Sequence, residues 1–297
     1  MDQFTDQLQP GKRFGKASEK RCVLSPADWL NALTSDEGYE VCTSIPYGSD
    51  ARQTLDVYSP ADAASAPVVV FFYGGSWQTG SKERYLFAAA ALAKRGHVVI
   101  VPDYRLYPEV RYPAFLDDGA LAVQWVKRNA RTYGGDPGRL FVMGHSAGAY
   151  IAAMLAIDDR WLTHAGLSPQ ADIAGLIGLS GPYDFLPLKD RTLKTIFGGA
   201  ERRETQPISH VSGAEPPALL ITGQLDRTVH PGNSKRLAAR LRHVGGTIQL
   251  LTFWNLGHLE TIGSLAPVLR FFAPTLRHID DFIAAKGRRS HSQDAAA

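Results

Sequence analysis

The residues Gly144-His145-Ser146-Ala147-Gly148 form a Gly-x-Ser-x-Gly sequence, a pattern that can present a serine hydroxyl for nucleophilic attack. The apolar residues 140–143 before it predict a buried strand, and the alanine-rich residues 147–157 after it predict a helix. Ser146 would then lie on a sharp turn between strand and helix, with its Oγ above the edge of a sheet. The two glycines leave room for strand and helix to approach closely. The pattern therefore predicts that Ser146 is a nucleophile.

A serine hydroxyl is a weak nucleophile, so it needs a neighbouring base, and a third group must fix the tautomer of that base. In proteins with this kind of turn, the chain order is serine, then acid, then histidine. Asp226 follows a predicted strand at residues 218–222, and His258 follows another at residues 247–253. We expect His258 to accept the serine proton and Asp226 to orient His258.

Two further residues invite a catalytic role. Asp184 comes soon after the predicted strand at residues 173–179, and it is the alternative to Asp226 as the orienting acid. His145 directly precedes the nucleophile, but a residue at this point of the turn should point away from Ser146. We therefore expect His145 to pack or to form hydrogen bonds without reacting.

A second glycine-containing loop, Gly74-Gly75-Ser76-Trp77, follows the apolar residues 68–72. A tetrahedral intermediate needs N–H donors where its oxygen becomes negative, and glycine lets the backbone approach that oxygen. We expect the donors to be the N–H groups of Gly75, Ser76 and Ala147. The residues expected to line a substrate pocket are Gly74, Trp77, Tyr183 and Phe185.

Buried strands alternate with helices along most of the chain, which predicts an α/β fold with a mostly parallel sheet and helices on both faces. Residues 181–216 interrupt this alternation with several prolines and glycines, and we expect them to form a small lid. Residues 1–20 should be a flexible arm, residues 21–286 one domain, and residues 287–297 a disordered tail. The expected strands are residues 40–45, 53–58, 68–72, 97–101, 140–143, 173–179, 218–222 and 247–253; the closing helix is expected at residues 266–284.

The composition is that of an ordinary globular protein, with 44% apolar and 21% charged residues among 297. Its 32 basic and 29 acidic residues give a net charge of +3, which gives no sign of nucleic-acid binding. The N-terminus carries acids and no apolar stretch, so we expect a cytoplasmic protein without stable membrane insertion. Cys22 and Cys42 could form one bridge, although two reduced thiols is the simpler interpretation. The oligomeric state stays open, with a homodimer among the alternatives.

Together these residues resemble the esterase and lipase branch of the α/β-hydrolase fold, which includes hormone-sensitive-lipase-like carboxylesterases and kynurenine formamidases. The landmarks are the two glycine loops, Asp226, His258, and Tyr133-Gly134-Gly135-Asp136-Pro137. Tyr73 stands where that family usually has histidine, so the hydrogen bonds that hold the loop must differ. Ser76-Trp77 replaces a third glycine, which points to the Gly-Gly-x-Trp branch. The resemblance implies no metal and no organic cofactor.

These expectations favour a serine carboxylesterase that acts on small to medium acyl or aryl esters through an acyl-enzyme. An arylformamidase, which hydrolyses N-formylkynurenine-type amides, is the alternative among hydrolases. A non-catalytic ligand-binding homologue is the alternative from another class, since a fold alone does not establish activity.

Overall fold

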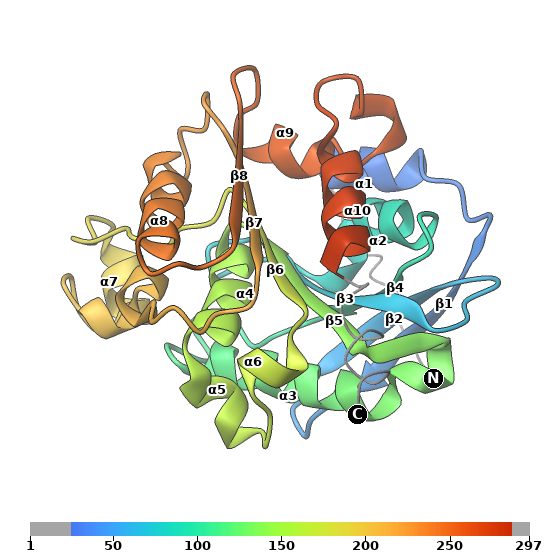
Figure 1. Cartoon of the computed structure of the whole chain (residues 1–297), viewed down its shortest axis with the longest axis horizontal. Helices are drawn as coiled ribbons and strands as arrows, with labels where there is room; N and C mark the ends of the chain where they lie inside the picture. Colours follow the sequence, from blue (N-terminus) through green and yellow to red (C-terminus); the bar gives the residue numbers. More distant parts are fainter. Residues whose placement is uncertain (1–24, 287–297) are drawn as a thin grey trace, which may run out of the picture.

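The computed structural model describes residues 25–286, and these form one eight-stranded sheet in the order β1-β2-β4-β3-β5-β6-β7-β8 (Figure 1). The pairs from β4 through β3 to β8 are parallel, whereas β2 runs antiparallel to both β1 and β4. The predicted mostly parallel sheet is confirmed. The strands are β1 (Tyr39–Pro46), β2 (Thr54–Pro60), β3 (Ala66–Phe72), β4 (Val98–Pro102), β5 (Gly135–His145), β6 (Gly175–Leu179), β7 (Ala218–Gly223) and β8 (Ile248–Phe253).

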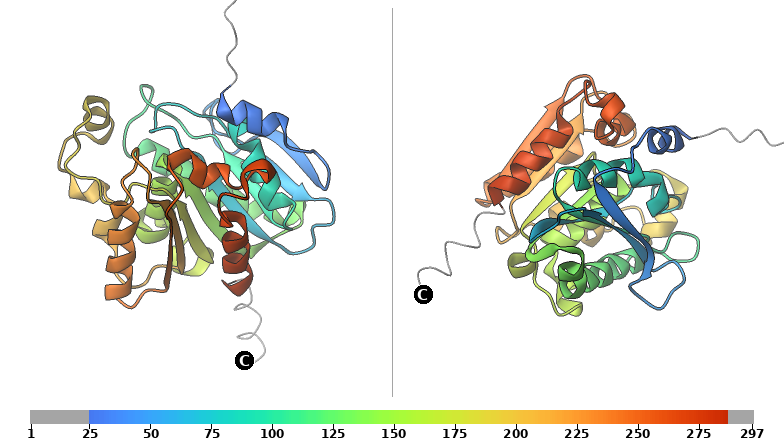
Figure 2. Two further views of the ribbon diagram at one scale, coloured as in Figure 1. Left: turned by 90° about the horizontal axis from the view of Figure 1, so that it is seen from above. Right: turned by 90° about the vertical axis from the view of Figure 1, so that its right-hand side faces the viewer.

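Helices cover both faces of this sheet, as the sequence predicts. Helices α2 and α10 lie on one face, and α3, α4 and α8 lie on the other, an arrangement that the turned views also show (Figures 1 and 2). The helices are α1 (Pro26–Ala32), α2 (Leu86–Ala93), α3 (Ala114–Asn129), α4 (Ala147–Ile157), α5 (Asp159–His164), α6 (Pro169–Asp172), α7 (Arg191–Phe197), α8 (Gly232–His243), α9 (His258–Gly263) and α10 (Thr275–Lys286). Single turns of 3-10 helix are η1 (Lys82–Tyr85), η2 (Ala130–Tyr133), η3 (Arg203–Thr205), η4 (Pro207–His210) and η5 (Pro267–Leu269).

The end of the chain differs from the expectation of one closing helix at residues 266–284. The structure has the short turn η5, then a break, and α10 begins only at Thr275. Pro274 explains the break, because proline disfavours helical backbone in the residue before it. The expected arm at residues 1–20, the expected tail at residues 287–297 and Cys22 lie outside the described residues.

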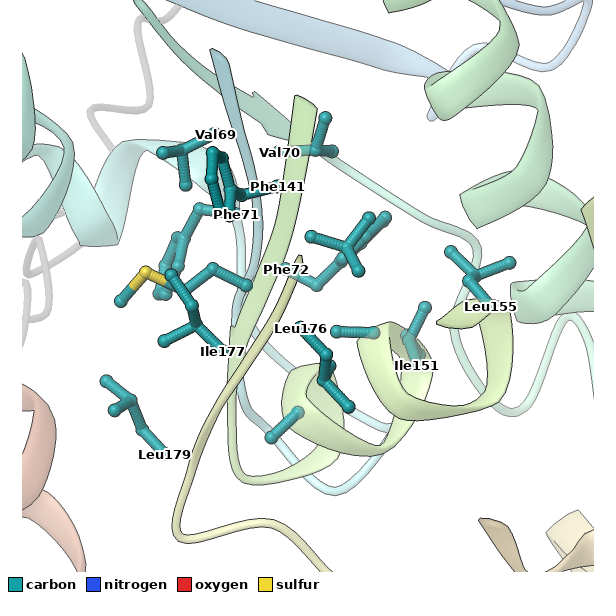
Figure 3. Packing of buried hydrophobic residues seen from close by; sticks show 14 of the residues in the cluster. Val69, Val70, Phe71, Phe72, Phe141, Ile151, Leu155, Leu176, Ile177 and Leu179 are labelled. Atoms are coloured by element: carbon teal, nitrogen blue, oxygen red, sulfur yellow. The ribbon is translucent and has the colours of Figure 1, made fainter. Parts of the chain in front are cut away.

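Alternate residues of the central strands point to opposite faces of the sheet, and both faces are buried under apolar side chains. On β3, Val70 and Phe72 face the side of α4, where Ile151 and Leu155 lie, while Phe71 points to the other side (Figure 3). All five side chains are fully buried. This two-sided burial is the reason that the central strands are continuously apolar.

The expected lid, residues 181–216, contains α7, η3 and η4. Phe197 at the end of α7 is buried, and its ring meets Trp77 edge-on at 4.9 Å between centroids. Phe185 stacks on the same Trp77 ring at 6.1 Å. Aromatic contacts of this kind add to the burial of apolar surface, so the segment is attached to the glycine loop after β3.

Replacing Gly148 with alanine should destabilise the fold by about 3 kcal/mol or more. The new Cβ would lie 2.0 Å from the backbone oxygen of Phe72, in a contact between α4 and β3 that is already close-packed. Helix propensity acts in the opposite direction, since alanine is favoured over glycine by about 1 kcal/mol. Any loss must therefore come from the clash.

The matched control is Gly119→Ala in α3, where the nearest atoms to the new Cβ belong to side chains, namely methyl groups of Ile151 and Leu155 at 3.0 Å and Cε1 of Phe72 at 3.5 Å. These side chains can shift, so the loss should be smaller. Urea unfolding measures both variants. Equal free energies of unfolding for Gly148→Ala and Gly119→Ala would contradict this account of the close contact.

Asp280 of α10 accepts a hydrogen bond from Arg95 and lies 2.7 Å from Nε2 of His97, next to β4. Burial raises the pKa of Asp280, but the hydrogen bonds from His97 and Arg95 outweigh it, so the pKa lies below its usual value. Such a carboxylate stabilises the fold above its unfolded-state pKa of about 3.9 and loses that effect as the pH falls through the folded-state pKa.

Asp280→Asn should therefore lower the free energy of unfolding at pH 7 by about 1–2 kcal/mol, and the difference should shrink as the pH falls below about 3.9 and through the lower folded-state pKa. Asp281→Asn is the control, because that side chain is 68% exposed and its ion pair with Arg277 spans 3.8 Å. Urea unfolding from pH 3 to pH 7 checks both. A gap between wild type and Asp280→Asn that stays constant across this range would be inconsistent with the proposed linkage.

Candidate active site

Ser146 lies at the sharp turn between β5 and α4. Its backbone has φ 54° and ψ −122°, a strained conformation for a residue other than glycine, and its N–H donates to the oxygen of Leu179 at 2.9 Å. A Cβ on Gly144 would lie 2.2 Å from the oxygen of Gly148, so glycine is required on both sides of the serine. The helix begins at the next residue, which directs the positive end of its dipole to the serine.

Asp226 and His258 lie in contact above the ends of β7 and β8. The Nδ1 of His258 is 2.8 Å from the carboxylate of Asp226, which also accepts hydrogen bonds from the N–H groups of Thr228 and Val229. Burial raises the pKa of Asp226, but the hydrogen bonds from His258 and Val229 outweigh it, and the pKa is below its usual value. An ionised Asp226 requires Nδ1 of His258 to carry the proton, which leaves Nε2 as the proton acceptor.

The predicted base, His258, lies close to the residue that directly precedes Ser146. The ring of His258 lies 4.8 Å from the ring of His145, the residue bonded to Ser146. A direct hydrogen bond between Ser146 Oγ and His258 is not formed in the described part of the chain. Such bonds are often long without substrate and tighten when it binds.

Asp184, the alternative acid, contacts α8 and not His258. Its carboxylate pairs with the guanidinium of Arg236 on α8, and its backbone oxygen accepts a second hydrogen bond from the same arginine at 2.6 Å. Its backbone N–H donates to Asn233. The structure therefore brings Asp226, and not Asp184, to His258.

The glycine loop after β3 turns back on itself beside Ser146. The oxygen of Gly75 accepts hydrogen bonds from the N–H groups of Gln78 and Thr79, both at 3.0 Å. Gly75 has φ 137°, and a Cβ there would lie 1.9 Å from the oxygen of Thr79. Within residues 25–286, the N–H groups of Gly75 and Ser76 donate to no protein acceptor. They are therefore free to bind an oxygen of a substrate.

Tyr73, which stands where the resembling family has histidine, holds this loop from below. Its hydroxyl donates to the carboxylate of Asp103 at 2.6 Å and accepts from Arg52 at 3.0 Å. Arg52 also donates to the backbone oxygens of Gly80 and Tyr104, at 2.6 and 2.7 Å. No sequence motif marks Arg52, since only the folded chain brings it to the loop. The changed hydrogen bonding that Tyr73 predicts is thus an arginine–tyrosine–aspartate chain.

His145 is almost completely buried, with 2% of its surface exposed. Its Nε2 lies 3.1 Å from the backbone oxygen of His258, and its Nδ1 has no hydrogen-bond partner in the described part of the chain. Burial, followed by repulsion from His258, lowers the pKa of His145 to about 3. The ring is therefore neutral at physiological pH, and the expected hydrogen-bonding role is present.

A cavity of about 770 Å³ opens over Ser146 and Ala147, beneath the segment at residues 181–216. Trp77 and Phe185 line it, as expected for the substrate pocket. Tyr183 does not line it, because this residue is fully buried and its hydroxyl packs against Gly178. The expectation that Tyr183 lines the pocket is therefore wrong. Gly74 lines a separate, smaller cavity of about 200 Å³ on the side of α1 and α9. The charged residues of the larger cavity are Asp184, Lys189, Asp190, Arg227 and Arg236, and the sequence indicated only Asp184 among them.

Neither a candidate metal cluster nor a membrane-spanning helix occurs in residues 25–286. These residues contain no group of three or more histidine, cysteine, aspartate or glutamate side chains that could hold a metal ion. In the same stretch, every helix is too short or too polar to cross a bilayer.

Several curated proteins are similar to this chain in sequence. The isoprenylcysteine alpha-carbonyl methylesterase ICME of Arabidopsis thaliana is 29% identical over 243 residues, which are 74% of this chain and 57% of that protein. Esterase LipC of Mycobacterium tuberculosis is 29% identical over 240 residues, 74% of this chain and 58% of its own length. Carboxylesterase NlhH of the same species is 38% identical over 141 residues, 46% of this chain and 42% of NlhH. The chain thus spans about half the length of the curated relatives it matches.

Solved structures share the fold. A truncated carbohydrate esterase from gut microbiota superposes with a TM-score of 0.76 at 19% identity and covers 86% of this chain and 99% of its own. The apo form of Thermogutta terrifontis esterase 2 has a TM-score of 0.70 at 25% identity and covers 86% and 97%. The protein has the α/β-hydrolase fold. Residues 55–241, more than half of the chain, match one sequence family within it, and the chain belongs to the BD-FAE family.

Proposed function

We propose that the protein is a serine hydrolase that cleaves carboxylic esters. The observation that carries this proposal is the hydrogen-bonded pair of Asp226 and His258 beside a strained serine turn. Such a pair supplies what a serine lacks, namely a base of fixed tautomer within reach. The names of the relatives, which are esterases or carboxylesterases, support the same chemistry.

In the proposed reaction, Oγ of Ser146 attacks the ester carbonyl carbon while its proton moves to Nε2 of His258. The carbonyl oxygen becomes negative and is held by the N–H groups of Ala147, Ser76 and Gly75. The C–O bond to the alcohol then breaks, and His258 gives its proton to the leaving oxygen. Water, deprotonated by His258, attacks the acyl-enzyme in the same way and releases the acid and free Ser146.

The size of the cavity supports substrates of small to medium length. About 770 Å³ would accommodate an acyl or aryl group together with part of its alcohol. Trp77 and Phe185 offer an apolar wall, whereas Lys189 and Arg227 place charge at the same cavity. A small-molecule ester with an apolar group and a polar group suits this lining.

The two alternatives have less support. The aromatic wall formed by Trp77 and Phe185 would suit a formamide of an aromatic substrate, but the relatives described above are named for esters. A non-catalytic binding protein would not need an ionised acid held 2.8 Å from a histidine. Ester hydrolysis is therefore the function that we propose.

The first test is the hydrolysis of p-nitrophenyl esters of increasing acyl length. Ser146→Ala should lower kcat by about 10⁴-fold or more, and Asp226→Asn by about 10⁴-fold, because the base then loses its tautomer. Asp184→Asn should retain most of the activity, since Asp184 contacts Arg236 and not His258. Turnover that persists in Ser146→Ala would sink the mechanism. An active Asp226→Asn together with an inactive Asp184→Asn would reassign the acid.

The second test compares substrates. The wild-type kcat/KM for p-nitrophenyl esters should exceed that for N-formylkynurenine by about tenfold or more, since the pocket must discriminate between them. Both substrates are assayed with Ser146→Ala as the background control. A higher kcat/KM for N-formylkynurenine would establish the formamidase alternative in place of the ester.

A further inference from the structure

We propose that His145 is a positioning residue for the catalytic base: its Nε2–H holds the backbone of His258, and its ring fixes the distance between the serine turn and His258. The inference rests on the proposed function, in which His258 is the base. It gives a role to the residue directly before the nucleophile.

The first support is the direction of the hydrogen bond. The oxygen of His258 can only accept, so Nε2 of His145, 3.1 Å away, must carry the hydrogen. His145 is covalently bonded to Ser146, and the acceptor belongs to His258. The bond therefore ties the side chain of the residue next to Ser146 to the backbone of His258, and it also fixes one tautomer of His145.

The second support is the buried nitrogen on the other side of the ring. With Nε2 protonated and the ring neutral, Nδ1 is a bare acceptor, and it is buried without a partner among residues 25–286. It lies 3.1 Å from the point that a Cβ on Gly74 would occupy, against the glycine loop. An unsatisfied buried acceptor destabilises a fold, and an apolar side chain of similar shape would avoid it. The benefit of histidine here must come from its other nitrogen, which holds His258.

The third support is the charge state. The rings of His145 and His258 lie 4.8 Å apart, and His258 becomes positive when it takes the serine proton. A second positive ring at this distance would oppose that step. Burial keeps the pKa of His145 at about 3, so this neighbour stays neutral throughout the reaction. His145 can thus lie close to His258 without lowering the proton affinity of His258.

The test compares variants that keep or lose the donor. His145→Gln retains an N–H at the end of a side chain of similar reach, whereas His145→Leu and His145→Met fill the space without a donor. The donor-free variants should lower kcat on p-nitrophenyl esters by about 10–100-fold, as expected for a base displaced by about 1 Å, with KM changed by less than about threefold. His145→Gln should recover most of the lost kcat.

Two further readouts separate positioning from folding. The proton on Nδ1 of His258, held by Asp226, should give a far-downfield proton NMR resonance in the wild type and in His145→Gln, and this resonance should broaden or vanish in His145→Leu. The thermal midpoint of His145→Leu should not fall in proportion to activity, because the variant also removes a buried unpaired nitrogen. If leucine prevents folding, His145→Met serves as the donor-free variant.

The proposal is overturned if donor-free variants keep wild-type kcat and the His258 resonance. It is equally overturned if glutamine is as impaired as leucine, since the donor would then be irrelevant. Failure of the proposed function is a different result. A wild type that hydrolyses no ester would refute the esterase proposal, while the resonance and its dependence on position 145 would still decide the role of His145.

Discussion

The close approach of α4 to the ends of β3 and β5 is the constraint on which the candidate site depends. A Cβ on Gly148 would lie 2.0 Å from the oxygen of Phe72, so helix and strand touch through bare backbone. This contact forces the chain to turn within one residue, and Ser146 takes the strained φ of 54°. The buried apolar core on both sides of the sheet keeps Ser146 in this strained conformation, since close-packed interiors do not relax locally. The turn both exposes the serine and starts α4 beside the glycine loop.

The other groups reach this point from loops at the carboxyl ends of parallel strands, where sites of α/β proteins collect. The Asp226 carboxylate is fixed by two backbone N–H groups before it meets His258. The glycine loop is held from below by Tyr73, and through it by Arg52. Each loop therefore has its own support, and the sheet sets the spacing between them.

Much of this arrangement could be predicted from the sequence, because the signals are local. Helix α4 follows from alanines after a strand, and the order of Ser146, Asp226 and His258 follows from the strands that precede them. The break before α10 is an exception: one helix was expected at residues 266–284, although Pro274 stands at the break and disfavours helical backbone in the residue before it.

What the sequence could not provide are contacts between distant segments. Tyr183 is an aromatic residue in the expected pocket region, yet its ring is buried beside Gly178 because the chain turns back under β6. Arg52 has no motif of its own, and although His145 lies in the serine motif, the backbone oxygen that it contacts belongs to His258, 113 residues along the chain. Only the packing of the folded chain brings such groups together, and residue types alone do not specify that packing.

The claim that Ser146 carries the nucleophilic oxygen is tested most directly by trapping the covalent intermediate. The protein is mixed with a fluorophosphonate or a slowly deacylating p-nitrophenyl ester, digested, and analysed by mass spectrometry. The account predicts one adduct, on the peptide containing Ser146, and none on that peptide in Ser146→Ala. An adduct on another residue, or turnover without any adduct on Ser146, would contradict it.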